Sequence, residues 1–396
     1  MIRLPLAWLS VTALLIAGCW SSAAEPDKLL IAGQQALAQK KVREALGHFR
    51  QAASNTPSSA AAQLLRGMTA EALGEFDEAL DAYKAGVKIK PSTQNHFRLG
   101  ALAERMGDTD QAIESLSASL LSGPPGDERV AEYLFRMLIE SENLPEALEL
   151  AKGRQWVGEQ TEYCDQEVKG LTEETRALLA MLLRPEHADC LFPVGIALTE
   201  SGLVRPARMI LIDRINNSSD QQVRKKSEVF LRHRLPDHDI AKLAESLNVT
   251  GYNLQYTIKD KQAALEVYQK AIAADGAFSW PYHNIAQVHL NAGETSEAME
   301  WYRKATNVNP NHWKAQLNMG NLAFRLNQYD DAVTAFRQAA LLKPDDPGGH
   351  SGLGRVLLSL GQKAEGIREL QEALRLDPSR QDDKKLLDDT LGRRTS

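Results

Sequence analysis

The chain has 396 residues, of which 43% are hydrophobic but only 6% are aromatic, and its formal net charge is −6. This composition suits many small layers of alanine and leucine better than one large core, so we expect an extended array of small units. No run of Lys and Arg interleaved with aromatics occurs, and the net charge gives no broad cationic field. Both observations argue against nucleic acid as a partner.

The first predicted element is an export signal. Arg3 is followed by an almost uninterrupted apolar stretch from Leu4 to Gly18. This pattern is typical of a signal-peptide h-region, and it is shorter than the roughly 20 apolar residues that a membrane-spanning helix needs. Residues 1–18 are therefore predicted to be a signal peptide, and the mature chain is expected to contain no transmembrane helix.

The cleavage site decides whether the protein is anchored. Residues 16–19, with the sequence Ile-Ala-Gly-Cys, resemble the lipobox of bacterial lipoproteins. The resemblance implies that Cys19 is acylated and that residues 19–26 form a tether, with the lipid as the only membrane contact. Trp20, rather than an aspartate, after the cysteine implies passage to the outer membrane. The alternative is cleavage after Ala24, which would leave a soluble periplasmic adaptor.

A period of 34 residues dominates the rest of the chain. Pro57 and Pro91 are 34 residues apart, and so are Pro310, Pro344 and Pro378 in turn. A period of this length indicates stacked helical hairpins. Each proline is expected to follow the end of the second helix of its hairpin.

Several residue types recur in register with the prolines. Ala298, Ala332 and Gly366 share one repeat position, and a bulky residue such as Tyr302 or Phe336 follows four positions later. These positions resemble the tetratricopeptide repeat family, whose units pair two antiparallel helices through small residues and place a bulky side chain between them. The resemblance implies an all-α fold, an α-solenoid of helical hairpins with two regular blocks joined by a degenerate helical middle.

The role of the small residues also follows from helix packing alone, without reference to the family. Two helices approach closely only where side chains are small, so the recurring glycines should mark the contact within each hairpin. Ala332, Phe336 and Ala339 recur at i, i+4 and i+7, and they should therefore be buried together on one helical face. The glycines are Gly33, Gly67, Gly100, Gly320 and Gly354.

These marks divide the chain into segments. Residues 27–152 are predicted to form an N-terminal repeat block and residues 245–378 a C-terminal one. Between them, residues 153–244 keep helical periodicity but lose most of the repeat marks and contain several prolines. Residues 379–396 are predicted to be a capping helix and a frayed tail, because a solenoid needs a polar-faced cap.

Export changes how the two remaining cysteines are interpreted. Cys164 and Cys190 form an even pair in an oxidising compartment. A disulfide between them would stabilise the degenerate region by roughly 3 to 4 kcal/mol. The other interpretation is two buried thiols, because the sequence does not set their separation in space.

No arrangement of residues in the sequence predicts catalysis. The glycines between Gly348 and Gly354 resemble a phosphate loop in composition, but no lysine follows in the required position and no strand is expected before them. His233 and His238 fit neither a His-x3-His pair nor a standard zinc set. We therefore expect no enzyme activity, no metal and no cofactor.

A helical array instead offers a groove lined by the first helix of each hairpin. In the C-terminal block, Asn284 and Asn318 take groove-facing positions one period apart. They resemble the asparagine ladder with which some tetratricopeptide proteins hold the backbone of an extended peptide. Ordinary solvated polar residues are the other interpretation. The predicted groove residues are His283, Asn284, Gln287, Lys314, Asn318, Asn321 and Arg355.

Export signal and repeat array together predict a non-enzymatic scaffold, an outer-membrane lipoprotein that recruits or assembles protein or peptide partners at the periplasmic face. The alternative is an accessory subunit of a machine that synthesises or exports a polysaccharide. Sugars usually stack on exposed aromatics, so exposure of Trp280, Trp301 and Trp313 on the concave surface would favour that alternative, and their burial would favour peptide capture. The open ends of a solenoid permit dimerisation, and the sequence sets no oligomeric state.

Overall fold

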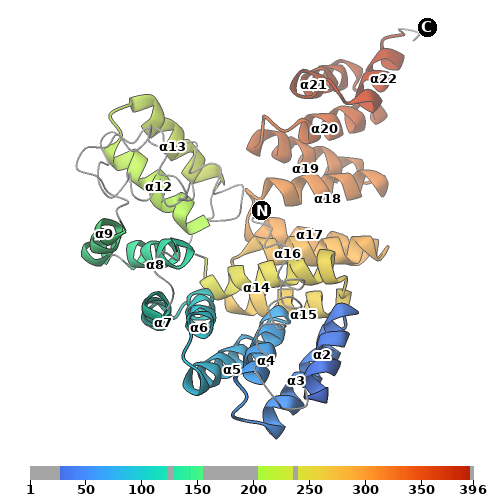
Figure 1. Ribbon diagram of the computed structural model, residues 1–396. Helices are drawn as coiled ribbons and strands as arrows, with labels where there is room; N and C mark the ends of the chain where they lie inside the picture. Colours follow the sequence, from blue (N-terminus) through green and yellow to red (C-terminus); the bar gives the residue numbers. More distant parts are fainter. Residues whose placement is uncertain (1–26, 123–127, 142, 155–203, 235–239, 393–396) are drawn as a thin grey trace. The chain divides into compact units, whose positions relative to one another are not determined.

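The structure is a computed structural model that describes residues 27–122, 128–141, 143–154, 204–234 and 240–392. The described residues form helices and no strands, which confirms the all-α expectation. They divide into two compact units, with unit 1 ending at Val267 and unit 2 beginning at Tyr268. Figure 1 labels the helices in chain order.

Unit 1 begins with stacked helical hairpins. The pairs α2–α3, α4–α5 and α6–α7 pack within themselves, and each hairpin also packs on the next. Further along the unit, α8 packs on α9 and α12 packs on α13, and α14 lies against α6. The helices are α2 (Lys28–Ala38), α3 (Val42–Asn55), α4 (Ala60–Ala72), α5 (Phe76–Ile89), α6 (Thr93–Met106), α7 (Thr109–Ser122), α8 (Glu128–Glu140), α9 (Leu144–Gly153), α12 (Val204–Asn217), α13 (Gln221–Arg234) and α14 (Lys242–Asn253).

Unit 2 repeats the same arrangement. A π-helical turn, η3 (Leu254–Ile258), and helix α15 (Lys261–Ala274) lead into it, and the boundary between the units falls within α15. The pairs α16–α17, α18–α19 and α20–α21 form hairpins, and α22 packs on α21 at the end. The helices are α16 (Ser279–Asn291), α17 (Thr295–Val308), α18 (Trp313–Arg325), α19 (Tyr329–Leu342), α20 (Pro347–Ser359), α21 (Lys363–Leu376) and α22 (Gln381–Thr390).

Five of the hairpins close where a glycine of the first helix faces a bulky side chain of the second. A Cβ placed on Gly67 would lie 2.5 Å from Cε1 of Tyr83, and one placed on Gly320 would lie 2.8 Å from Cδ1 of Phe336. No real Cβ fits at these distances, so only glycine allows the contact. The predicted role of the glycines is confirmed, since the same arrangement pairs Gly33 with Phe49, Gly100 with Leu116 and Gly354 with Leu370.

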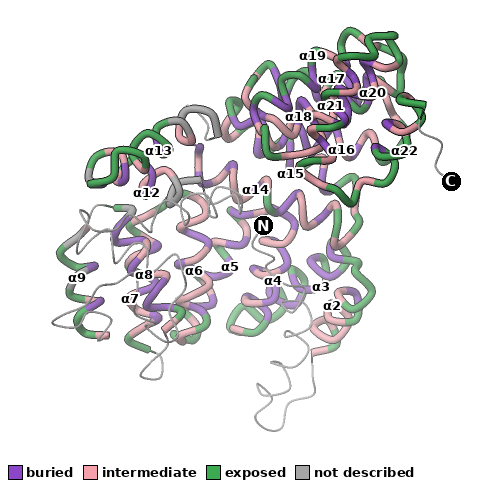
Figure 2. Tube along the Cα trace, turned by 90° about the horizontal axis from the view of Figure 1, so that it is seen from above, coloured by how far each residue is buried: buried purple, intermediate pink, exposed green. Residues whose placement is uncertain are grey.

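The buried face of the second helices follows the predicted pattern. Ala332, Phe336 and Ala339 on α19 are all buried, as predicted, and Figure 2 shows buried and exposed stretches alternating along the helices. Helix α22 follows the last hairpin and packs on α21, and its Leu387 is buried. Burial of these alanines and aromatics is what holds successive hairpins together.

In the five hairpins with this glycine, the turn contains one residue with positive φ, seven positions after the glycine. Gly74 and Gly361 take this position with φ of 70° and 76°, where glycine has no steric cost. Two hairpins place other residues there: Lys40 has φ of 61° and Asn327 has φ of 59°. The turn therefore keeps its geometry even where the sequence is unfavourable for it.

The π-helical turn η3 accommodates one extra residue. In the regular hairpins, the glycine of the first helix precedes the small residue of the second by 12 positions, as Gly67 precedes Ala79, but Gly251 precedes Ala264 by 13. A π-helical turn is wider than an α-helical one, so it can take up an additional residue inside a helix. The N–H of Asp260 then donates to the carbonyl of Leu254 over 2.9 Å.

Candidate functional site

The seven predicted groove residues lie on the first helices of the three hairpins of unit 2. Helix α16 carries the first three, α18 the next three and α20 the last. Their exposure differs widely, and the buried ones face the interior of the unit. His283 and Asn284 are buried, Gln287, Lys314, Asn318 and Arg355 are half-buried, and Asn321 is exposed.

Gln287 and Arg355 form side-chain hydrogen bonds inside unit 2. Nε2 of Gln287 donates to the phenolic oxygen of Tyr302 on α17. Nη2 of Arg355 donates to Oδ1 of Asp383 on α22 over 2.6 Å, so the capping helix engages this guanidinium. The polar face that remains is therefore centred on α18.

A cluster of aromatic rings surrounds His283. The rings of His283 and His312 are 5.2 Å apart between centroids, and Trp280 lies 4.5 Å from His312. His283 also makes an edge contact with Tyr302 at 5.6 Å. Both histidines are buried, and Nδ1 of His283 and both ring nitrogens of His312 lack a hydrogen-bond partner in the described part of the chain. The cluster joins α16, α17 and the start of α18.

This environment keeps both histidines neutral. Burial lowers the pKa of His283 well below its usual value, and the neighbouring His312 and Lys314 lower it further. Burial, followed by Lys314, lowers the pKa of His312 to about 3. Sequence reasoning missed His312, because this residue lies in the turn after Pro310 and acquires its environment only from the packed hairpins.

The three tryptophans of unit 2 are half-buried. Nζ of Lys304 lies 3.9 Å from the ring centroid of Trp301, and Nζ of Lys343 lies 4.7 Å from that of Trp313. A cation over the ring face is a favourable contact. Trp280 packs on His312, so each indole already has a neighbour on one face.

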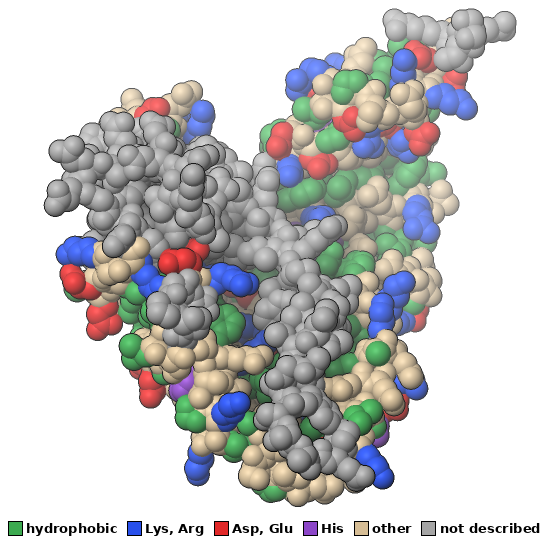
Figure 3. Space-filling view, viewed as in Figure 1, with side chains coloured by type: hydrophobic (Ala, Val, Ile, Leu, Met, Phe, Trp, Pro, Cys, Tyr) green, Lys and Arg blue, Asp and Glu red, His purple; other side chains and the backbone are tan. Residues whose placement is uncertain are grey.

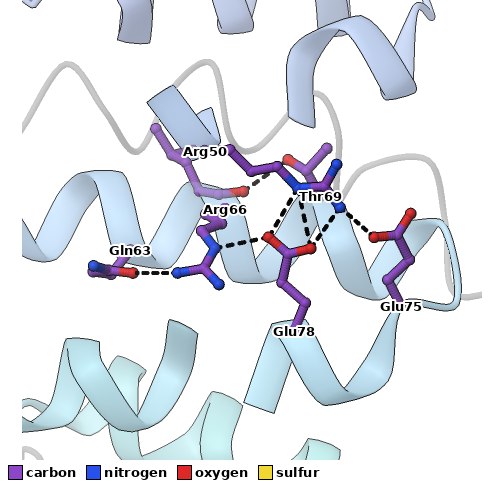
Figure 4. Close-up of polar contacts among 7 residues, drawn as sticks. Arg50, Gln63, Arg66, Thr69, Glu75 and Glu78 are labelled. Carbon is purple, nitrogen blue, oxygen red and sulfur yellow. Dashed lines mark hydrogen bonds and ion pairs between the residues drawn. The ribbon is translucent and has the colours of Figure 1, made fainter. Parts of the chain in front are cut away.

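In unit 1, a connected group of polar side chains lies between the first two hairpins (Figure 4). Nη2 of Arg50 on α3 lies 2.6 Å from Oε2 of Glu78 on α5, and Nε of Arg66 on α4 lies 2.8 Å from the other oxygen. Arg50 also pairs with Glu75 over 2.5 Å. These side chains border a depression of about 560 Å³ lined by Arg50, Ala53, Ser54, Arg66, Glu78 and Asp81.

The Arg50–Glu78 pair is one member of an ion-pair ladder with a spacing of 28 residues. Arg303 pairs with Asp331 over 3.2 Å, and Arg337 pairs with Glu365 over 3.3 Å. Each pair joins the second helix of one hairpin to that of the next. Because the hydrogen bond from Arg50, together with Arg66, outweighs burial, the pKa of Glu78 is lowered to about 2. These charges satisfy one another, which makes the ladder a structural feature.

Several predictions fall outside the described residues. They are the signal peptide, the acylated Cys19, the tether, and the Cys164–Cys190 pair. Among the residues that the structure does describe, no helix has the length and apolar character needed to cross a bilayer. In the same ranges, His, Cys, Asp and Glu side chains form no group of three or more that could hold a metal ion.

On the face drawn in Figure 3, acidic and basic side chains are interspersed along the helices.

Family models for the tetratricopeptide repeat match residues 32–92, 281–312 and 317–380. These stretches are tetratricopeptide repeats, and in 32–92 and 317–380 the glycines packed against bulky side chains agree with that assignment. No curated protein matches the sequence.

Solved structures resemble parts of the chain at low scores. MamA from Desulfovibrio magneticus RS-1 is 22% identical, over 39% of this chain and 86% of that one, with a TM-score of 0.34. Yeast Tom70 is 16% identical, over 88% and 76% of the two chains, with a TM-score of 0.29. YrrB, described as a tetratricopeptide protein with an unusual peptide-binding site, is 20% identical, over 38% and 76%, with a TM-score of 0.35.

Proposed function

We propose that this chain, which carries tetratricopeptide repeats in both of its units, is a non-enzymatic scaffold that binds protein or peptide partners. Arrays of this kind present long surfaces built from successive first helices, and such surfaces suit extended partners. The proposal concerns binding alone, and it assigns no catalytic role to any residue.

The observation that carries the proposal is a polar stripe on α18. Lys314, Asn318 and Asn321 are at i, i+4 and i+7, so they lie on one face of the helix. Lys314 and Asn318 are half-buried and Asn321 is exposed. An ammonium group and two amides offer several donors and two acceptors, which can pair with the backbone of an extended peptide whatever its sequence.

Crosslinking in the native cells tests this proposal. A photoreactive phenylalanine at position 321 of the full chain should crosslink to a partner protein, and the double variant Asn318→Ala/Asn321→Ala should retain less of that partner. Asn307→Ala on α17 is the control, because Asn307 is equally an exposed asparagine but lies on a second helix. Equal partner retention by the double variant and the control would reject the stripe as the binding surface.

The location of the scaffold is a second part of the proposal. We place it at the periplasmic face of the outer membrane, held by lipid on Cys19, on the strength of the apolar stretch and the lipobox-like residues 16–19. Intact mass of the mature protein, compared with a Cys19→Ala variant, tests the anchor. An acylated N-terminal cysteine is expected. A mature chain that begins at Glu25 without lipid would instead indicate a soluble periplasmic adaptor.

A further inference from the structure

In unit 1, helix α14 covers the ends of first helices that belong to earlier hairpins. Nζ of Lys242 lies 3.4 Å from Oε1 of Glu104 at the end of α6. Next to it, Nη2 of Arg105 donates to Oγ1 of Thr250 over 3.2 Å, although the two residues are 145 positions apart. Figure 1 draws α14 beside α6. This helix is therefore seated on the N-terminal hairpins.

Helices α15 and α14 cover the turn between α4 and α5. A Cβ placed on Gly74 would lie 3.0 Å from Val267 of α15 and 3.4 Å from Leu247 of α14. Leu73, directly before this glycine, is only 6% exposed. We call this surface the turn edge: in each hairpin it comprises the residues four to seven positions after the hairpin glycine. At the α4–α5 hairpin of unit 1 the turn edge is therefore covered by the chain itself.

In unit 2 the apolar residues at the position of Leu73 are exposed to solvent. Leu326 and Leu360 follow their hairpin glycines by six positions, as Leu73 does, but they are 39% and 40% exposed. Two positions before them, Phe324 and Leu358 are half-buried. Leucines of this exposure, one repeat apart and flanked by further apolar side chains, form a continuous apolar strip along the turn edge.

The charges along the strip point to the partner. Arg325 occupies the position of Arg105, which binds α14 in unit 1, but it is exposed and has no polar partner within the part of the chain described. Lys363, at the start of α21, is exposed as well. Where unit 1 presents Glu104 to Lys242, unit 2 presents the apolar Phe324. A partner helix with an apolar face and acidic residues beside it therefore fits this strip better than a helix with basic residues beside its apolar face.

We propose that the turn edge of unit 2 binds an amphipathic helix of a partner protein, with apolar residues against Leu326 and Leu360 and a carboxylate paired with Arg325. Helices α18 and α20 pack directly, so their axes are about 8 to 10 Å apart. Two turns of a helix rise about 11 Å, so partner residues at i and i+7 match that spacing. The inference rests on the proposed scaffold function and names the partner chemistry of a second surface.

The experiment places the same photoreactive phenylalanine singly at positions 326, 360, 341 and 321 of the full chain in its native cells. Position 341 is the control, because Leu341 is 72% exposed but lies near the end of α19, away from the turn edge. Crosslinks at 326 and 360 should join one partner protein at a segment with apolar residues at i, i+3 or i+4 and i+7. Arg325→Glu should lower their yield about tenfold, with unchanged circular dichroism.

Each outcome decides between the two proposals. If positions 326 and 360 crosslink no more than position 341 while position 321 still captures a partner, the turn edge is not a binding surface and the scaffold stands. Crosslinks from 326 and 360 only to second copies of this chain would also overturn the inference. If none of the four positions captures a partner, the scaffold proposal fails and the inference fails with it. A yield that Arg325→Glu leaves unchanged would overturn the predicted acidic flank.

Discussion

The repeats of unit 1 and unit 2 share one internal packing but differ in the surfaces built on it. Both contain hairpins that close by a glycine against a bulky side chain, three in unit 1 and two in unit 2. In unit 1, Glu78 of the ion-pair ladder is 19% exposed and bridges two arginines, whereas its counterpart in unit 2, Asp331, is 56% exposed and meets one. Unit 2 instead buries a histidine pair. The residues that recur with the 34-residue period therefore determine how the helices pack within a hairpin. The residues at the other positions determine which ion pairs and buried histidines each unit contains.

The largest effect is expected from the shared packing. Phe336→Ala should cost about 3 to 5 kcal/mol, because the ring fills the space beside both Gly320 and Gly352. Contacts in a repeat array run mainly between neighbours, so the loss should stay in unit 2. Hydrogen exchange resolved by peptide should show faster exchange from α18 to α20. The matched Phe49→Ala variant should affect the first hairpin of unit 1, and exchange that rises equally in both units would contradict the idea of independent blocks.

The next largest difference between the two units is expected in their loss of stability at low pH. The pKa of His283 and that of His312 are lowered in the folded state, so their neutral forms contribute stability above the unfolded pKa near 6.5, and this contribution is lost as the pH falls below it. Lys314 faces the pair and opposes protonation further. For His312 alone, about 2 kcal/mol should be lost between pH 7 and pH 5.

Urea unfolding followed by limited proteolysis at pH 7, 6 and 5 should show unit 2 loosening first. In unit 1, His48 and His96 are half-buried. Glu78 in that unit has a lowered pKa, so its contribution to stability is lost only as the pH falls from about 4.5 to about 2. The double variant His283→Phe/His312→Phe should abolish the loss in unit 2 between pH 7 and pH 5. Loss that persists in this variant would assign the acid response to other groups.

A smaller difference is expected between the Arg50–Glu78 and Arg303–Asp331 pairs of the ion-pair ladder, in the free energy of unfolding that is lost when each is broken. Glu78→Gln removes an acceptor shared by Arg50 and Arg66 and should cost about 1 to 2 kcal/mol. Asp331→Asn breaks one exposed pair and should cost less than about 0.5 kcal/mol. Urea midpoints of the two variants at low and high salt measure the difference. Equal costs would mean that burial of Glu78 adds nothing to its ion pairs.

Much of this fold could be predicted from local spacing. The 34-residue period, the recurring glycines and the small residues opening second helices depend on neighbours within one or two hairpins, so a single sequence contains them. The π-helical turn was also visible in principle, because Gly251 and Ala264 are one residue too far apart.

The surfaces were harder to predict because they depend on distant parts of the chain. Nothing in the local pattern places Thr250 beside Arg105, 145 positions away. The burial of His283 likewise depends on Trp280 and on His312 from the following turn. Sequence periodicity assigns a residue to a face of its helix, but it does not say what covers that face. Arg355, for example, meets Asp383 of the capping helix.

The smallest expected effect lies in the hairpin turns, where unit 1 uses Lys40 and unit 2 uses Asn327 at the same position of positive φ. A left-handed conformation costs an ordinary residue about 1 kcal/mol or more, whereas asparagine tolerates it and glycine adopts it freely. Lys40→Gly should therefore raise the free energy of unfolding by about 0.5 kcal/mol, after the greater entropy of glycine in the unfolded chain is subtracted. Asn327→Gly should change it by less.

Gly361→Ala provides the control for backbone strain alone, because a Cβ at this position, where φ is 76°, would meet nothing within 4 Å. It should destabilise unit 2 by about 1 kcal/mol, as measured by the urea midpoint. If Gly361→Ala were neutral, positive φ would carry no cost in this turn, and a gain from Lys40→Gly would then have to come from the loss of the lysine side chain. A cost at Gly361 together with a gain at Lys40 would show that both units keep one turn geometry and that unit 1 retains it despite an unfavourable residue.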